Sequence, residues 1–104
     1  MHTRVARYGY SGDAHSLARR AEEGMLPVFQ AQPGFKGYTL VDSEGEVISI
    51  TSWDSAADAD EASALAVEWI AENMAGEIDL KEVRVGEVLF STVLGVSAKA
   101  GAAG

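Results

Sequence analysis

The chain has 104 residues, of which 47% are hydrophobic and 23% are charged, an ordinary balance for one soluble globular domain. No stretch approaches the ~18 uncharged apolar residues that cross a bilayer, and the first residues lack the apolar core of a secretory signal. We therefore expect a cytoplasmic protein without a membrane span. The absence of cysteine excludes disulfides, thiolate metal ligands and a cysteine nucleophile.

The net charge is −8, and it is unevenly distributed. No lysine or arginine occurs between Gly37 and Leu80, where eleven carboxylates lie from Asp42 to Asp79. Such a surface repels phosphate backbones and anionic membranes, so we expect neither nucleic acid nor a membrane as a partner. We interpret the carboxylates as a solvated face that keeps the protein soluble; the alternative is an acidic docking face for a basic partner.

The N-terminal part predicts a strand followed by an amphipathic helix. β-branched and aromatic residues are frequent over Thr3–Tyr10. Asp13 suits the N-cap of a helix in which apolar residues recur at three- and four-residue spacing over Ala14–Val28. Gly24 and Pro27 lie where this helix should bend or end, because proline cannot donate an in-helix hydrogen bond.

A hairpin is predicted next. Pro33-Gly34 stops the helix, and strands are expected over Phe35–Val41 and Glu46–Trp53. The connector Asp42–Gly45 is a turn whose glycine is free to take a positive φ.

The second half predicts another helix and a last strand. Ser55 and Asp58 form the clearest capping signal, since each side chain can accept from the other's backbone N–H. The helix extends to about Asn73, and its predicted buried stripe comprises Ala62, Leu65, Ala66, Trp69 and Ile70. Val83–Leu94 is predicted as the last strand. We expect one domain over residues 1–96 and a flexible tail over 97–104.

The element order β-α-β-β-α-β predicts an α+β, ferredoxin-like fold: a four-stranded antiparallel sheet with both helices on one face. A sheet with one wet face should alternate apolar and polar residues, yet Val47–Thr51 and Val88–Phe90 do not alternate cleanly. Such strands are typical of burial on both faces. Because helices cover only one face, we predict a homodimer that pairs sheet to sheet.

Two motifs carry a resemblance to a known family. Gln32–Tyr38 places a Pro-Gly-Phe turn between helix and second strand, and Ile50–Ser55 ends the third strand with a tryptophan before an acid and a helix cap. With these motifs the sequence resembles the antibiotic-biosynthesis-monooxygenase-like domains of the dimeric α/β-barrel superfamily, over roughly Thr3–Leu94. The resemblance implies a small cytoplasmic homodimer with a ligand cavity between the sheet and the helices of each protomer. Some members oxidise polycyclic aromatic polyketides with molecular oxygen and no cofactor, others cleave haem, and many have no known activity.

The haem-degrading branch of this family does not fit the sequence. That branch needs an asparagine in the first strand, then a tryptophan and a histidine in the second helix; the corresponding positions here hold Val5, Ala62 and Glu72. No histidine lies beyond His15, so an axial imidazole on that helix has no candidate. We therefore expect no haem and no other cofactor.

The cofactor-free chemistry implied by the resemblance binds a phenol or hydroquinone, removes a proton and lets the anion meet oxygen in a dry cavity. It needs aromatic walls, a hydrogen-bond partner for the ligand oxygen and a cation. The candidate ligand-binding residues are Arg7, Tyr38, Trp53 and Trp69, with Phe90 and His15 as further candidates. No catalytic residue is assigned. We expect the site between the sheet and the second helix.

Each candidate also has a structural interpretation. Trp53 and Trp69 are typical of core packing. Arg7 shares a side of the first strand with Val5, and if that side faces the helices it needs a carboxylate partner or a bound anion. The opposite side of that strand, with Arg4 and the two tyrosines, would then form the dimer contact.

No metal site is expected, because His2 and His15 do not form a useful ligand spacing with nearby acids. The sequence thus predicts a small-molecule-binding protein, as a candidate cofactor-independent monooxygenase acting on an aromatic or quinol-like substrate. The alternative is a non-catalytic ligand-binding or assembly module of the same fold.

Overall fold

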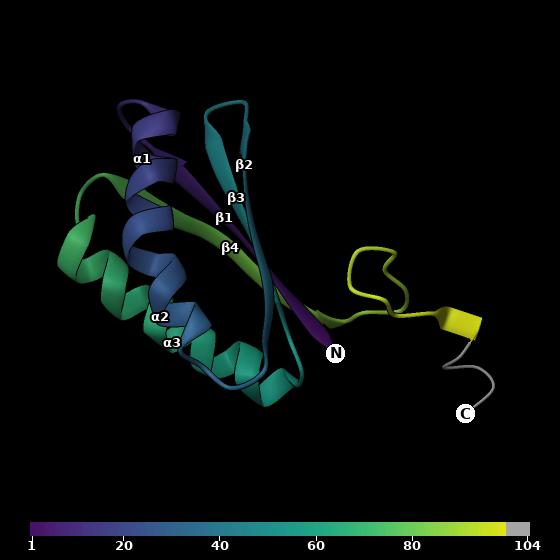
Figure 1. The fold of residues 1–104 in the computed structure, drawn as a ribbon. Coiled ribbons are helices and arrows are strands. Elements are labelled where there is room, and N and C mark those ends of the chain that lie inside the picture. The colour runs from purple at the N-terminus through teal and green to yellow at the C-terminus, as the bar shows by residue number, and fades with distance from the viewer. Residues whose placement is uncertain (100–104) are drawn as a thin grey trace.

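A computed structural model describes residues 1–99 of the chain. Its elements, in chain order, are β1 (His2–Tyr10), α1 (Ala14–Arg20), η1 (Ala21–Met25), α2 (Leu26–Gln30), β2 (Phe35–Ser43), β3 (Glu46–Trp53), α3 (Ala56–Asn73) and β4 (Ile78–Glu87). The strands form one antiparallel sheet in the order β2-β3-β1-β4, and the helices cover one of its faces (Figure 1). The predicted ferredoxin-like α+β fold is confirmed.

The local signals for helix starts and stops lie where the sequence predicts them. The Asp13 carboxylate accepts a hydrogen bond from the backbone N–H of Ser16 at 2.9 Å, which caps α1. The Ser55 hydroxyl accepts from the N–H of Asp58 at 3.1 Å and caps α3. Gly34, after the first helix, has a φ of +84°, which turns the chain into β2.

The first helix does not end at Pro27. It continues to Gln30 as three abutting segments, with the π-helical segment η1 between α1 and α2. Pro27 lies in the first turn of α2, where a missing N–H removes no α-helical hydrogen bond, so the proline is tolerated. A π-helical turn inside an α-helix is rare and occurs frequently at functional sites.

The hairpin between β2 and β3 is tighter than the predicted connector. β2 extends to Ser43, and only Glu44 and Gly45 form the turn, with φ values of +49° and +83°. Two consecutive positive φ values are typical of the hairpin turn whose twist matches the flanking strands.

The predicted last strand was wrong at both ends. β4 covers Ile78–Glu87, whereas Val83–Leu94 was expected. β4 lies at the edge of the sheet and pairs only with β1, so its ladder follows the length of β1 and ends where the Val88 N–H donates to the Met1 carbonyl. The segment after β4 leaves the sheet and projects from it (Figure 1). Of the predicted tail, residues 100–104 lie outside the described part of the chain.

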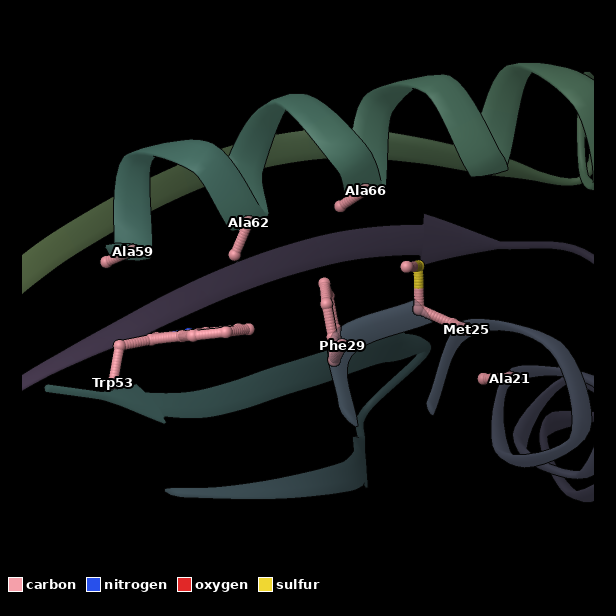
Figure 2. Packing of buried hydrophobic residues seen from close by; sticks show 7 residues of the cluster. All are labelled: Ala21, Met25, Phe29, Trp53, Ala59, Ala62 and Ala66. Carbon is pink, nitrogen blue, oxygen red and sulfur yellow. The ribbon is translucent and has the colours of Figure 1, made fainter. Parts of the chain in front are cut away.

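The core lies between the helices and the sheet. Trp53 and Phe29 occupy the space under three alanines of α3, whose short side chains point toward them (Figure 2). Met25 and Ala21 of η1 extend the same cluster along the first helix. Small residues on α3 let large aromatic rings fill the layer below, which satisfies the close packing of a protein interior.

The two faces of the sheet differ in cover. On β1, Ala6 and Tyr8 are buried and pack with Ile70 of α3, so the side that carries Arg4 faces the helices. The suggestion that this side forms the dimer contact was wrong. The side that carries Arg7 is the open face, which the described helices leave uncovered (Figure 1).

Candidate functional site

A cavity lies between the sheet and the helices, beside the core cluster. Its apolar walls include Met25 and Phe29 from the first helix, and Trp69 and Ile70 from α3. The volume open to the centres of water molecules is about 40 Å³. Because one water needs about 10–15 Å³ by this measure, the cavity as folded holds a few waters.

The polar side of the cavity comes from the strands. Arg4 and Tyr8 on β1, Tyr38 on β2 and Ser49 on β3 line it together. The strand register explains the grouping: Arg4 and Tyr38 are both direct partners of Thr51, one on each side of β3, so all three side chains point to the helix-facing side. An apolar cavity with a few convergent polar groups is the usual form of a small-molecule site.

Arg4 is the most unusual of these residues, because it is a charged residue that is 1% exposed. Its Nε donates to the Ser63 hydroxyl at 2.6 Å, and its Nη2 donates to the Tyr8 hydroxyl at 3.4 Å. Its Nη1 is buried and has no hydrogen-bond partner among residues 1–99. A buried guanidinium without a countercharge destabilises the fold unless another group compensates its charge.

Tyr38 adds a second polar group with a perturbed acidity. Burial raises the pKa of its hydroxyl above the ordinary value, while the hydrogen bond with Ser49 and the positive charge of Arg4 act in the opposite direction. The phenol therefore stays protonated at neutral pH and is available as a hydrogen-bond donor.

Two of the predicted ligand-binding residues line this cavity and two do not. Tyr38 and Trp69 line it. Trp53 fills the core instead: it is 0% exposed, and its ring packs edge-on against Phe29 and Phe35, with centroids 5.5 and 5.4 Å apart. Its indole N–H donates to the Thr51 hydroxyl at 2.9 Å.

Arg7 lies on the opposite face of the sheet. Its guanidinium pairs with Glu46 at 2.8 Å and approaches Glu82 at 3.6 Å, and the Glu46 carboxylate raises the pKa of Arg7 above its ordinary value. Arg7 thus has the carboxylate partner that its structural interpretation required, in place of a bound ligand. Phe90 is also remote from the cavity, because it lies in the projecting segment after β4 and is largely exposed.

Arg4 is the site residue that sequence reasoning missed. Each side of β1 carries one arginine beside hydrophobic residues, Val5 with Arg7 and the two tyrosines with Arg4, so alternation alone does not show which side faces the helices. The available signal was Ala6, a small residue between Arg4 and Tyr8, which suits a strand covered closely by other elements.

Trp69 covers the cavity from the helix side. Its indole lies against Gly24 of η1, so close that a Cβ at position 24 would be 2.5 Å from Cζ2 of the ring. The ring therefore bridges α3 and the first helix, and only a glycine fits beneath it. The π-helical segment thus contains the glycine against which Trp69, a residue of the cavity wall, packs.

A second hollow lies on the outside of the first helix, beside β2. It has a volume of about 430 Å³ and includes His15, Arg19 and Glu22. Tyr38 and Leu40 line both this hollow and the internal cavity. These two side chains therefore separate the cavity from the exterior along the β2 edge.

In the part of the chain that the structure describes, no helix is long and apolar enough to cross a membrane. Residues 1–99 hold no group of three or more histidine, aspartate or glutamate side chains placed to bind a metal ion. A cytoplasmic location stays a prediction.

The chain is thus a ferredoxin-like domain that holds a mainly apolar cavity between one face of its sheet and the helices. No protein-family profile matches the sequence, and none of the curated proteins matches it.

Solved structures match the fold closely. SnoaB, a cofactor-independent oxygenase from Streptomyces nogalater, is 19% identical over 88% of this chain and 95% of its own, with a TM-score of 0.67. A candidate antibiotic biosynthesis monooxygenase from Chloroflexus aurantiacus is 17% identical over 90% of this chain and 98% of its own, also with a TM-score of 0.67. Rv0793 from Mycobacterium tuberculosis is 22% identical over 88% of this chain and 97% of its own, with a TM-score of 0.61. This chain has the antibiotic-biosynthesis-monooxygenase-like fold, as the motifs predicted.

Proposed function

We propose that the chain binds a small aromatic or quinol-like molecule in the cavity and oxidises it with molecular oxygen, without a cofactor. The observation that carries this proposal is the apolar cavity whose polar residues, Arg4, Tyr8, Tyr38 and Ser49, gather on the sheet side. The fold shared with a cofactor-independent oxygenase supports the same chemistry.

The atoms and electrons of the proposed reaction balance between substrate and O₂ alone, so the protein supplies no reacting group. A substrate of the anthrone type loses the two hydrogens of its ring methylene and gains one oxygen atom as a carbonyl, while the second oxygen atom of O₂ leaves as water. The protein binds the substrate, holds its oxygen by hydrogen bonds and excludes bulk water from the electron-rich anion.

The cavity must widen to admit such a molecule, because about 40 Å³ holds only a few waters. Trp69 is the group whose displacement opens it toward the helices, since its ring bridges α3 and Gly24. Side-chain rearrangements of this kind are common when a ligand binds.

Oxygen uptake tests the proposal. The purified protein is mixed with a panel of anthrones and hydroquinones in the presence of a chelator, and uptake above the uncatalysed rate is expected for at least one compound. Ala66→Leu fills the cavity, because Ala66 lines it and is buried, and this variant should lose the activity. Ala64→Leu, exposed on the same helix, is the matched control. Equal uptake by both variants would argue against this cavity as the site.

The second candidate function is a non-catalytic ligand-binding or assembly module of the same fold. The small volume of the closed cavity favours it, because a solidly packed protomer needs no substrate space. Compounds that bind without oxygen uptake, or a protein that binds none of them, would support this candidate over the oxygenase.

We also propose that the chain forms a homodimer through the open face of the sheet. Val5 is paired with Ile50 and Val41 with Ile48, so four partly exposed apolar side chains lie together on that face. A stable interface buries about 1,200–2,000 Å², and covering this face with a second copy removes the patch from water.

The mass in solution tests the dimer. Light scattering at micromolar concentration is expected to give twice the mass of one chain. Ile50→Glu should shift the protein to the single-chain mass, because it places a charge in the buried interface. Val67→Glu, at an exposed apolar position of α3, should leave the dimer intact. A single-chain mass for the unmodified protein would refute the proposal.

A further inference from the structure

We propose that residues 88–96, which follow β4, form an arm that binds a second copy of this chain on the open face of its sheet. The inference rests on the proposed homodimer in one respect, that two copies meet through their open faces. It adds the segment that holds the two copies together and the side chains that make the contact.

The composition of the arm differs from that of the chain as a whole. None of its nine residues is charged, although 23% of the whole chain is charged. An uncharged, apolar segment without proline associates readily with other chains when it is left exposed. A soluble protein therefore needs this segment covered. The hydrophobic residues of the arm are Val88, Leu89, Phe90, Val93, Leu94 and Val96.

The protomer does not cover the arm by itself. Leu89 is 71% exposed, Phe90 is 70% exposed and Val93 is 92% exposed. Within residues 1–99, each of the other exposed large hydrophobic side chains is at most 59% exposed. The apolar surface that most needs a partner therefore lies on the arm.

The arm nevertheless has a defined conformation. Ser91 and Val96 form an antiparallel bridge with both backbone hydrogen bonds, at 2.8 and 3.0 Å. The backbone N–H of Leu94 donates to the Ser91 hydroxyl at 3.0 Å, and Gly95 takes a φ of +72° within the turn. A loop that is already formed loses less conformational entropy when it binds, so its exposed side chains are suited to a protein contact.

The arm lies on the side of the sheet that faces away from the helices (Figure 1). The strand register gives the same result. Gly37 pairs with Ser52 and Ser52 pairs with Thr3, which shares its side of β1 with Val5. A Cβ at Gly37 would therefore point to the open face, where it would lie 4.0 Å from Cδ2 of Leu94. The arm thus projects from the face that the second copy is proposed to cover.

A second copy of the chain suits the arm better than its own helices do. The open face carries partly exposed apolar side chains, Val5, Val41, Ile48 and Ile50. The exposed side of α3 carries carboxylates, which an apolar arm would strip of water without pairing them. A two-fold axis that brings two open faces together also brings each arm to the other copy, so the same contact forms twice.

The dissociation constant of the dimer tests the contribution of the arm. Sedimentation equilibrium from nanomolar to micromolar concentration measures it. Phe90→Asp and Val93→Asp should each raise the constant at least about tenfold, because each places a charge in an apolar contact. Both side chains are largely exposed in the protomer, so circular dichroism should show both variants folded. Val67→Asp, at an exposed valine of α3, is the matched control and should leave the constant unchanged.

Cross-linking locates the contact. The chain has no cysteine, so Phe90→Cys supplies a single thiol for a benzophenone maleimide, which also keeps an aromatic group at this position. This chain is mixed with isotope-labelled unmodified chain, left to exchange subunits and irradiated, and mass spectrometry of the digest identifies the linked residues. The cross-link is expected on the isotope-labelled chain, within β1, β2 or β3. The same reagent on Val67→Cys should link no second chain.

The outcomes separate the arm from the homodimer. A single-chain mass for the unmodified protein refutes the homodimer, and the arm contact with it. An unchanged dissociation constant in both arm variants overturns the arm contact and leaves the homodimer standing. Cross-links from position 90 that stay within one chain, or that reach the helices of the second chain, also overturn the arm contact.

Discussion

Replacing Trp53 with alanine should remove the largest single contribution to the core. The side chain is fully buried and lies beside Phe29 in the core cluster (Figure 2). Its ring packs edge-on against Phe29 and Phe35, with centroids 5.5 and 5.4 Å apart, and its indole N–H donates to the Thr51 hydroxyl. Removal of a buried tryptophan costs about 3–5 kcal/mol, and each lost aromatic pair adds about 0.5–1.5 kcal/mol beyond burial. We therefore expect a loss near the upper end, about 5 kcal/mol.

That loss is large for a domain of this length, whose free energy of unfolding is about 5–15 kcal/mol. Urea denaturation followed by far-ultraviolet circular dichroism measures it. With a slope of about 2 kcal/mol per molar urea, the midpoint should fall by about 2–3 M. Protein concentration is held constant, because association contributes to apparent stability.

Two companion variants make this measurement decisive. Trp53→Phe keeps a buried ring and loses mainly the indole hydrogen bond to Thr51, so it should cost about 1–2 kcal/mol. Val67→Ala, at a side chain that is 59% exposed, should change stability by less than about 0.5 kcal/mol. A midpoint shift for Trp53→Ala no larger than that of Val67→Ala would refute the assignment of this ring to the core.

Trp69→Ala should cost less stability than removal of the fully buried tryptophan and should change ligand affinity, because Trp69 borders the cavity; titration of a bound aromatic compound together with urea denaturation measures both. Gly24→Ala, which in an exposed helix would gain about 1 kcal/mol, should instead lower the urea midpoint and alter indole fluorescence, because the new Cβ would collide with Trp69. Ser55→Ala should cost about 1 kcal/mol in the same denaturation assay, since it removes the N-cap of α3. Arg20 lowers the pKa of Glu77, so this carboxylate stabilises the fold above its unfolded-state pKa and loses that effect as the pH falls through its folded-state pKa. Glu77→Gln should therefore flatten the acid side of the profile of Tm against pH, and an unchanged profile would contradict the ion pair.

The features that can be predicted from the sequence alone are local ones. The Asp13 and Ser55 caps and the positive φ at Gly34 depend on groups within a few residues of one another, so they can be predicted from neighbouring residues in the sequence. The order of helices and strands follows from such signals together with hydrophobic periodicity, and the order defines the ferredoxin-like topology.

Features that depend on distant partners became clear only once the chain was seen folded. The length of β4 is set by β1, because an edge strand extends only as far as its neighbour offers backbone hydrogen bonds. Alternation along β1 puts Arg4 and Arg7 on opposite faces, and only the packing of α3 on Ala6 and Tyr8 decides which arginine is buried. A side-chain period of two is symmetric between the faces of a sheet, and it takes a third element to break that symmetry.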